Sequence, residues 1–165
     1  MREYLQNSPG DMVLGWDVTV WEGVLLNCIG HAVVRNGDEF LCVTPSKYPE
    51  RKLLFLPDPS LTFDFEDDNA RLPVREIALS SRPEVFKLIE VTMLERQIKV
   101  KYPVSSKPTL VQGQDAVEIQ RLGQMKSQLM LRVILVTADH NTRCPCGSGK
   151  KFRKCHRSDV ERMLS

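Results

Sequence analysis

The sequence feature that most restricts how this chain folds is a cluster of metal-ligand side chains near its C-terminal end. Three thiols and one imidazole fall within thirteen residues, as Cys144, Cys146, Cys155 and His156. Zinc takes this donor set in closed tetrahedral sites, with sulfur at about 2.3 Å and nitrogen at about 2.0–2.1 Å. Glycines at 147 and 149 let the chain turn back between the two ligand pairs. The pattern therefore predicts a zinc site held by these four side chains.

The stretch from Cys144 to His156 reads Cys-Pro-Cys-Gly-Ser-Gly-Lys-Lys-Phe-Arg-Lys-Cys-His, and it resembles the SEC-C motif at the C-terminus of the SecA preprotein translocase ATPase. The resemblance covers about 20 of 165 residues, and Arg157 stands where the family often has glycine. In SecA the motif binds zinc and presents a small basic surface to the export chaperone SecB and to the ribosome. The resemblance implies a structural zinc ion, since four protein ligands leave no open position for a substrate. It also implies docking on a protein partner, a SecB-like chaperone or the ribosome, through Lys150, Lys151, Phe152, Arg153 and Lys154.

The charge of the chain is concentrated at this end. Residues 141–165 hold seven Lys or Arg and two acidic residues, a net charge of +5, which leaves −3 for residues 1–140. A basic segment of this kind also fits a second class, a nucleic-acid-associated regulatory protein of the antitoxin or mobile-element type, in which the tail contacts phosphates. The leading interpretation is an adaptor that docks through its finger, and the nucleic-acid class is its alternative.

A third class, an enzyme with an appended SEC-C localisation module, stays open but is less favoured. The sequence shows no Ser-His-Asp order, no metalloprotease helix motif and no dinucleotide fingerprint. Gly149-Lys150 does not make a phosphate-binding loop, because Cys144 and Lys151 stand where that motif requires glycine and Ser or Thr. We therefore predict no catalytic and no cofactor-binding residues apart from the metal ligands.

Length and hydropathy suggest one body with a short appendage. At 165 residues the chain has room for a body over residues 1–140, the SEC-C motif over 141–158 and a tail over 159–165. The longest apolar stretch, 129–136, is far shorter than the roughly 20 residues of a membrane helix. The first residues lack the apolar block of a signal peptide, so we expect a bacterial cytoplasmic protein with reduced cysteines.

The expected fold class is α+β, with an antiparallel β-rich N-terminal body, two helices and a small C-terminal zinc finger. Apolar runs closed by turn residues predict strands at 13–20, 23–35, 39–44, 52–56 and 61–65. Asn36-Gly37 favours a tight hairpin between the second and third runs, because both residues tolerate positive φ. Further along we expect a helix over about 82–96, an exposed strand at 98–102, a loop at 103–113 and a helix from near Asp115. The β-branched run 133–136 fits either a helix or a strand.

Several other residues have both a structural and a functional interpretation. Cys28 and His31 suggest a nucleophile and a base or half of a metal site, but an odd spacing in a strand puts them on opposite faces, and a core role is favoured for them and for Cys42. The acidic run of Asp64, Glu66, Asp67 and Asp68 fits a solvated loop better than a cation site. Aromatic residues along the strands are expected to fill the core, namely Trp16, Trp21, Tyr48 and Phe55. His140 borders the cluster, but the four ligands account for the site without it.

Overall fold

The computed structural model describes residues 9–44, 53–67, 69–103, 110–139 and 141–165. The chain divides into two compact units. The first comprises Met1–Trp21 and Leu26–Ile77, and the second comprises Glu22–Leu25 and Ala78–Ser165. An antiparallel sheet forms the N-terminal part, and helices and the Cys and His cluster follow it, so the predicted α+β class is confirmed.

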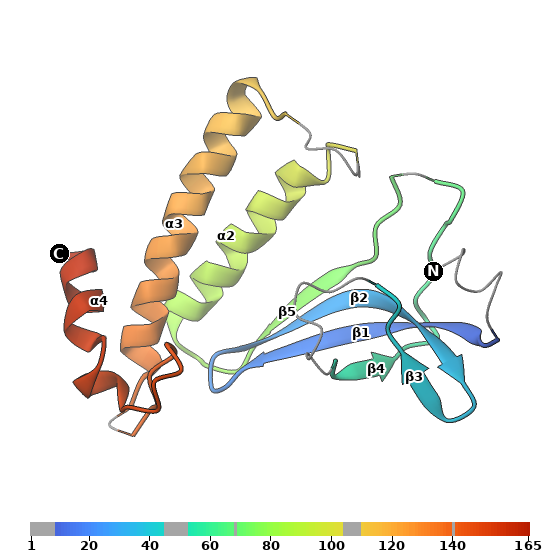
Figure 1. Ribbon diagram of the computed structural model, residues 1–165. Coiled ribbons are helices and arrows are strands. Elements are labelled where there is room, and N and C mark those ends of the chain that lie inside the picture. Colours follow the sequence, from blue (N-terminus) through green and yellow to red (C-terminus); the bar gives the residue numbers. More distant parts are fainter. Residues whose placement is uncertain (1–8, 45–52, 68, 104–109, 140) are drawn as a thin grey trace. The chain divides into compact units, whose positions relative to one another are not determined.

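The N-terminal sheet has five strands and curls into a half-barrel (Figure 1). The strands are β1 (Asp11–Trp21), β2 (Leu25–Asn36), β3 (Glu39–Leu41), β4 (Phe55–Pro57) and β5 (Val74–Ala78). Their order is β3-β2-β1-β4, and β5 pairs with β2. Trp16 of β1 lies opposite Leu56 of β4, and Val34 of β2 lies opposite Leu41 of β3. Each of the shorter strands therefore pairs with one of the two long strands, β1 or β2.

Trp16 is the largest buried side chain of this sheet. Its side chain is 5% exposed, and Val33 and Val34 are buried with it in the first unit. The indole Nε1 donates a hydrogen bond to Asp58 Oδ2 at 2.8 Å, and the Arg75 guanidinium lies 4.9 Å from the ring centroid. Because the polar edge of the ring has a partner, the indole is buried without an unsatisfied donor.

The hairpin predicted around Asn36-Gly37 is confirmed, with a shift of one residue. Asn36 is the last residue of β2 and pairs with Glu39, so the turn is formed by Gly37 and Asp38. Gly37 has φ +61°, and no described residue other than glycine has a positive φ. A turn that needs positive φ only at its first central position is satisfied by one glycine, which leaves Asn36 free to extend the strand.

Two strand predictions are wrong, and one strand was not predicted. Residues 61–65 are not a strand, because Asp64 accepts the Glu66 N–H at 2.9 Å in a local turn. Residues 98–102 are not a strand either, since the helix before them runs on to Lys99 and the Tyr102 N–H bonds back to the Lys99 carbonyl. The sequence does not predict strand β5, because its run of five residues, Val-Arg-Glu-Ile-Ala, is short and contains two charged side chains.

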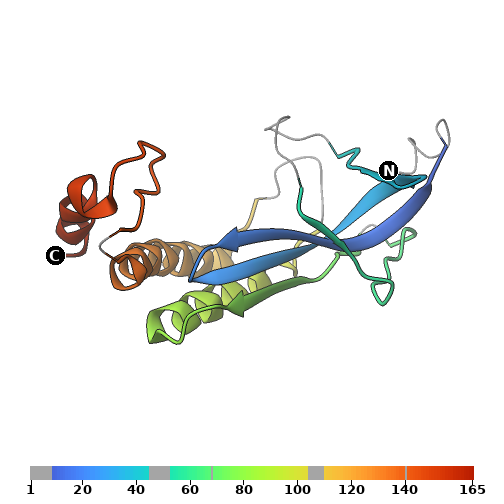
Figure 2. The same ribbon diagram turned by 90° about the horizontal axis from the view of Figure 1, so that it is seen from below.

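The second unit contains two long helices, α2 (Pro83–Lys99) and α3 (Gly113–Thr137), which lie side by side (Figures 1 and 2). Helix α2 has proline in its first turn, where a missing N–H costs nothing. Helix α3 includes residues 133–136, so this run is helical. The buried apolar residues of the two helices are Val85, Leu88, Val91, Leu122 and Val133. None of the described helices is long and apolar enough to cross a membrane.

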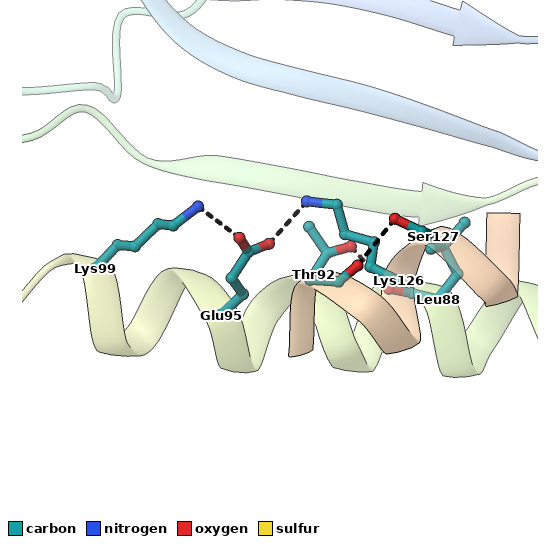
Figure 3. Close-up of polar contacts among 7 residues, drawn as sticks. Leu88, Thr92, Glu95, Lys99, Lys126 and Ser127 are labelled. Atoms are coloured by element: carbon teal, nitrogen blue, oxygen red, sulfur yellow. Dashed lines mark hydrogen bonds and ion pairs between the residues drawn. The ribbon is translucent and has the colours of Figure 1, made fainter. Parts of the chain in front are cut away.

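A buried carboxylate links the two helices (Figure 3). Glu95 of α2 accepts hydrogen bonds from Lys99 Nζ at 2.5 Å and from Lys126 Nζ of α3 at 2.7 Å. Just beyond the same C-terminal end of α2, Lys101 Nζ and Tyr102 Oη donate to Asp115 of α3 at 3.0 and 2.9 Å. These polar contacts fix the register of the two helices along their shared interface.

Candidate metal centre

The chain leaves α3 through a turn organised by Asp139. Its Oδ1 accepts the backbone N–H groups of Asn141 and Thr142 at 2.7 and 2.6 Å. A narrow backbone ladder follows, in which the Cys144 N–H donates to the Lys150 carbonyl and the Phe152 N–H donates to the Thr142 carbonyl, both at 2.8 Å. The ladder closes a loop that carries both members of the first ligand pair.

Two glycines make this loop possible. Gly147 and Gly149 have φ +78° and +72°, in the left-handed region that other residues enter only with strain. The chain then forms a short 3-10 helix, η1 (Phe152–Lys154), and a terminal helix, α4 (Arg157–Leu164). Cys155 and His156 lie between these two elements and face the loop, as the sequence predicted.

The four ligand atoms converge on one point. The sulfurs of Cys144, Cys146 and Cys155 and one ring nitrogen of His156 all lie within 4.8 Å of one another. His156 Nδ1 is 3.2 Å from the sulfurs of Cys144 and Cys155, and the sulfurs of Cys146 and Cys155 are 3.7 Å apart. Ligands at the corners of a tetrahedral zinc site stand roughly 3.5–3.8 Å apart, given the usual bond lengths. The cluster can therefore hold a metal ion with Nδ1 of His156 as the nitrogen ligand.

The two thiols of the loop differ in acidity. Hydrogen bonds from the Ser148 hydroxyl and backbone, together with Cys144, lower the pKa of the Cys146 thiol to about 6. Cys144 accepts a backbone hydrogen bond from Cys146 that lowers its pKa, but burial and the neighbouring thiols outweigh it, and the pKa of Cys144 is raised. The loop thus holds one thiol of lowered pKa, Cys146, beside one of raised pKa, Cys144.

Ser148 lies where it can support two of the ligands. Its Oγ is 3.1 Å from Cys146 Sγ and 3.4 Å from Cys155 Sγ. The Lys150 N–H points to the same oxygen at 3.4 Å. A hydroxyl that donates to a ligating thiolate orients it and withdraws charge from it, as outer-sphere groups do in metal sites. Ser148 stands between the two glycines of the motif, but no pattern of metal-ligand residues in the sequence points to it.

One side of the cluster is buried and the other faces solvent. Cys144 is 5% exposed, whereas Cys146 and His156 are exposed. Cys144 forms a small core with Phe152 and Val160, against which Leu131, Ile134 and Leu135 of α3 and the next residue, Ala138, pack. Phe152, which we expected on the partner surface, is 2% exposed, because an aromatic side chain at this position fills the finger interior. It is not part of the exposed surface.

The other four residues of the expected partner surface, Lys150, Lys151, Arg153 and Lys154, are exposed. Lys151 Nζ donates a hydrogen bond to Asn141 Oδ1 at 2.8 Å. Among the described residues, Lys150, Arg153 and Lys154 have no ion-pair partner, whereas Arg157 pairs with Glu161 and Arg162 pairs with Asp159. The finger therefore presents uncompensated positive charge next to the metal ligands.

The remaining candidate residues form no second metal cluster. Within the described ranges, no other group of three or more His, Cys, Asp or Glu side chains converges. His31 Nε2 contacts Cys42 Sγ at 3.2 Å across the β2–β3 hairpin, a pairing that sequence spacing did not reveal. Cys28 is half-buried in β2.

The aromatic and acidic candidates are placed as follows. Trp16 is buried, as predicted, and Trp21 and Phe55 are half-buried. Asp64 and Asp67 each accept a backbone N–H two residues on, at 2.9 and 2.8 Å, which is loop chemistry. Tyr48, Asp68 and His140 lie outside the described residues.

Comparison with known proteins supports the assignment of the finger. Residues 141–158 match the SEC-C motif family, so the chain carries a C-terminal SEC-C motif with a Cys and His metal-binding group. No curated protein and no solved structure gives a significant match to the chain.

Proposed function

We propose that this protein is a zinc-binding bacterial adaptor that docks on a protein partner through its SEC-C finger. The observation that carries the proposal is the convergence of Cys144, Cys146, Cys155 and His156 within a SEC-C motif. SEC-C motifs bind zinc, and three sulfurs and one nitrogen suit that ion best. Four protein ligands fill the coordination shell, so the zinc is structural. Reduced thiols are required, which fits the cytoplasm.

The docking surface consists of the exposed cations beside the ligands. Lys150, Arg153 and Lys154 are exposed and have no ion-pair partner among the described residues. A rigid, metal-held loop presents these charges with little loss of conformational freedom on binding. The partner is an acidic protein surface, and by resemblance to SecA the first candidates are a SecB-like chaperone and the ribosome.

The test compares binding of the purified full-length protein to SecB and to ribosomes. Lys150→Glu with Arg153→Glu reverses two unpaired charges and leaves the ligands untouched, so we expect binding to fall at least about tenfold while zinc stays at one ion per chain. Arg35→Glu with Lys87→Glu is the control for net charge, because it makes the same change at exposed positions outside the finger and disrupts only two exposed ion pairs, which contribute little to stability.

Three outcomes separate the alternatives. Loss of binding only in the finger variant supports the adaptor. Equal binding by both variants shows that the basic surface is not the docking site. Binding to duplex DNA or structured RNA that falls steeply with added salt, in place of protein binding, favours the nucleic-acid class, because phosphate contacts release counterions.

A further inference from the structure

Helix α3 carries apolar side chains on two faces. Leu122 and Val133 are buried in the helical unit. Leu131, Ile134, Leu135 and Ala138 follow the spacing of a single helical stripe, and they pack against the finger core. The last two turns of α3 are therefore covered by the finger, and the finger is built on the end of the helix.

The finger side of this contact depends on a metal ligand. Its core consists of Cys144, Phe152 and Val160, which are 5%, 2% and 8% exposed. Cys144 is both a candidate metal ligand and one of the buried residues of that core. A segment of about 25 residues cannot bury enough apolar surface to fold without a metal or an outside partner. The finger therefore packs against α3 only when a metal ion holds its four ligands together.

Helix α4 belongs to the same assembly. Val160 of α4 is part of the core, and Leu164 packs against it. The contact therefore extends beyond the SEC-C motif, which ends at residue 158. Metal loss would release the loop, η1 and α4 together and leave the α3 stripe facing water.

We propose that metal occupancy of the finger controls the stability and exposure of the C-terminal end of α3, so that the finger is a metal-dependent cover over an apolar helix face. This inference rests on the metal-binding part of the proposed function and is independent of the docking partner. With metal bound, the stripe of Leu131, Ile134 and Leu135 is covered. Without metal, the stripe is exposed and the last turns of α3 fray.

The test is hydrogen exchange of the full-length protein, loaded with zinc and then stripped by a chelator under reducing conditions. We expect backbone amides of residues 131–138 to exchange about tenfold faster or more after zinc removal, along with those of 141–164, because an uncovered helix end opens locally. Amides in the middle of α2 are the internal reference. Unchanged exchange at 131–138, with faster exchange at 141–164, would show an independent finger and overturn the proposal.

A matched pair of variants tests the reverse direction of the coupling. Leu135→Ala removes a contact with the finger but no ligand, and we expect zinc to pass to a chromogenic chelator several-fold faster. Met130→Ala is the control, since Met130 is 42% exposed on the same helix and is not part of the finger contact. Equal zinc loss from both variants contradicts the coupling.

The outcomes are distinguishable from failure of the docking proposal. Zinc binding and α3 protection without any SecB or ribosome binding support the cover and refute the docking partner. Absence of zinc binding by the wild type refutes both. Partner binding with unchanged α3 exchange refutes the cover alone.

Discussion

At the scale of single residues, Glu95 shows how a charge is kept away from water. Its side chain is 10% exposed, and Lys99 and Lys126 both donate hydrogen bonds to it. Burial raises the pKa of Glu95, but the hydrogen bonds from Lys126 and Lys99 outweigh it, and the pKa is lowered from its ordinary value of 4.5. A buried carboxylate is costly unless paired, so these lysines are what permits its position between the helices.

Glu95→Gln is expected to lower the free energy of unfolding by about 1–3 kcal/mol at neutral pH, because Lys126 keeps a weaker acceptor. The lowered pKa means that the contribution of the ionised carboxylate is complete above about pH 4.5 and is lost as the pH falls through the lowered value. Wild type and variant should therefore converge in stability in acid. Urea unfolding at neutral and acid pH measures both effects.

Glu90→Gln is the control for this prediction. Glu90 pairs with Lys87 at 2.9 Å on the same helix, but its side chain is 56% exposed. Exposed pairs of this kind contribute about 0.5 kcal/mol or less. A loss in Glu90→Gln equal to that in Glu95→Gln would mean that helix propensity, rather than the buried pair, explains the effect.

At the scale of elements, the close approach of β1 and β4 depends on Gly15, which has no side chain. A Cβ added at Gly15 would lie 2.3 Å from the Leu56 carbonyl oxygen and 2.6 Å from the Phe55 ring. Gly15 pairs with Pro57 in the register of the two strands. Strand β4 has three residues, so it has little other pairing to hold it in place.

Gly15→Ala is expected to destabilise the sheet by about 2 kcal/mol or more, because backbone must move to admit the methyl group. Gly123→Ala is the opposite case, since Gly123 lies inside α3 and an added Cβ meets nothing within 4 Å. There we expect a gain of about 0.5–1 kcal/mol from helix propensity. Urea unfolding of both variants tests the pair, and a stable Gly15→Ala protein would show that β4 is not held by this contact.

The elements that sequence reasoning found are those with strong local signals. The long strands, the Gly37 turn, helix α2 and the four ligands each follow from residues close together in the chain. The features that the sequence does not predict depend on contacts between residues far apart in the chain. Strand β5 is recognisable only by its pairing with β2, and the His31–Cys42 contact only by the hairpin register. The burial of Phe152 requires knowing what lies inside the finger.

At the scale of the whole molecule, the two units carry different optical signals. The two tryptophans, Trp16 and Trp21, both belong to the first unit. Helices α2, α3 and α4 all belong to the second. Tryptophan fluorescence therefore reports on the sheet, and the far-ultraviolet helix signal reports on the unit that contains the metal ligands.

Zinc is expected to raise the thermal midpoint of the helix signal and to leave the tryptophan midpoint unchanged. A ligand at about a hundred times its Kd stabilises the state it binds by about 2.7 kcal/mol, and each kcal/mol shifts the midpoint of a domain this size by about 4–8 °C. Scans with and without zinc, followed by both signals, measure the difference. A parallel shift of both midpoints would show that the two units unfold as one cooperative body.

The shared core of the finger and α3 also determines how much chain must be grafted to transplant the motif. Residues 141–158 carry all four ligands, but the apolar residues beneath them belong to α3, and Val160 and Leu164 belong to α4. A carrier protein given only the motif would receive the four candidate metal ligands without the apolar residues that pack beneath them. A segment that keeps the finger intact in another protein must therefore begin before Leu131 and end after Leu164.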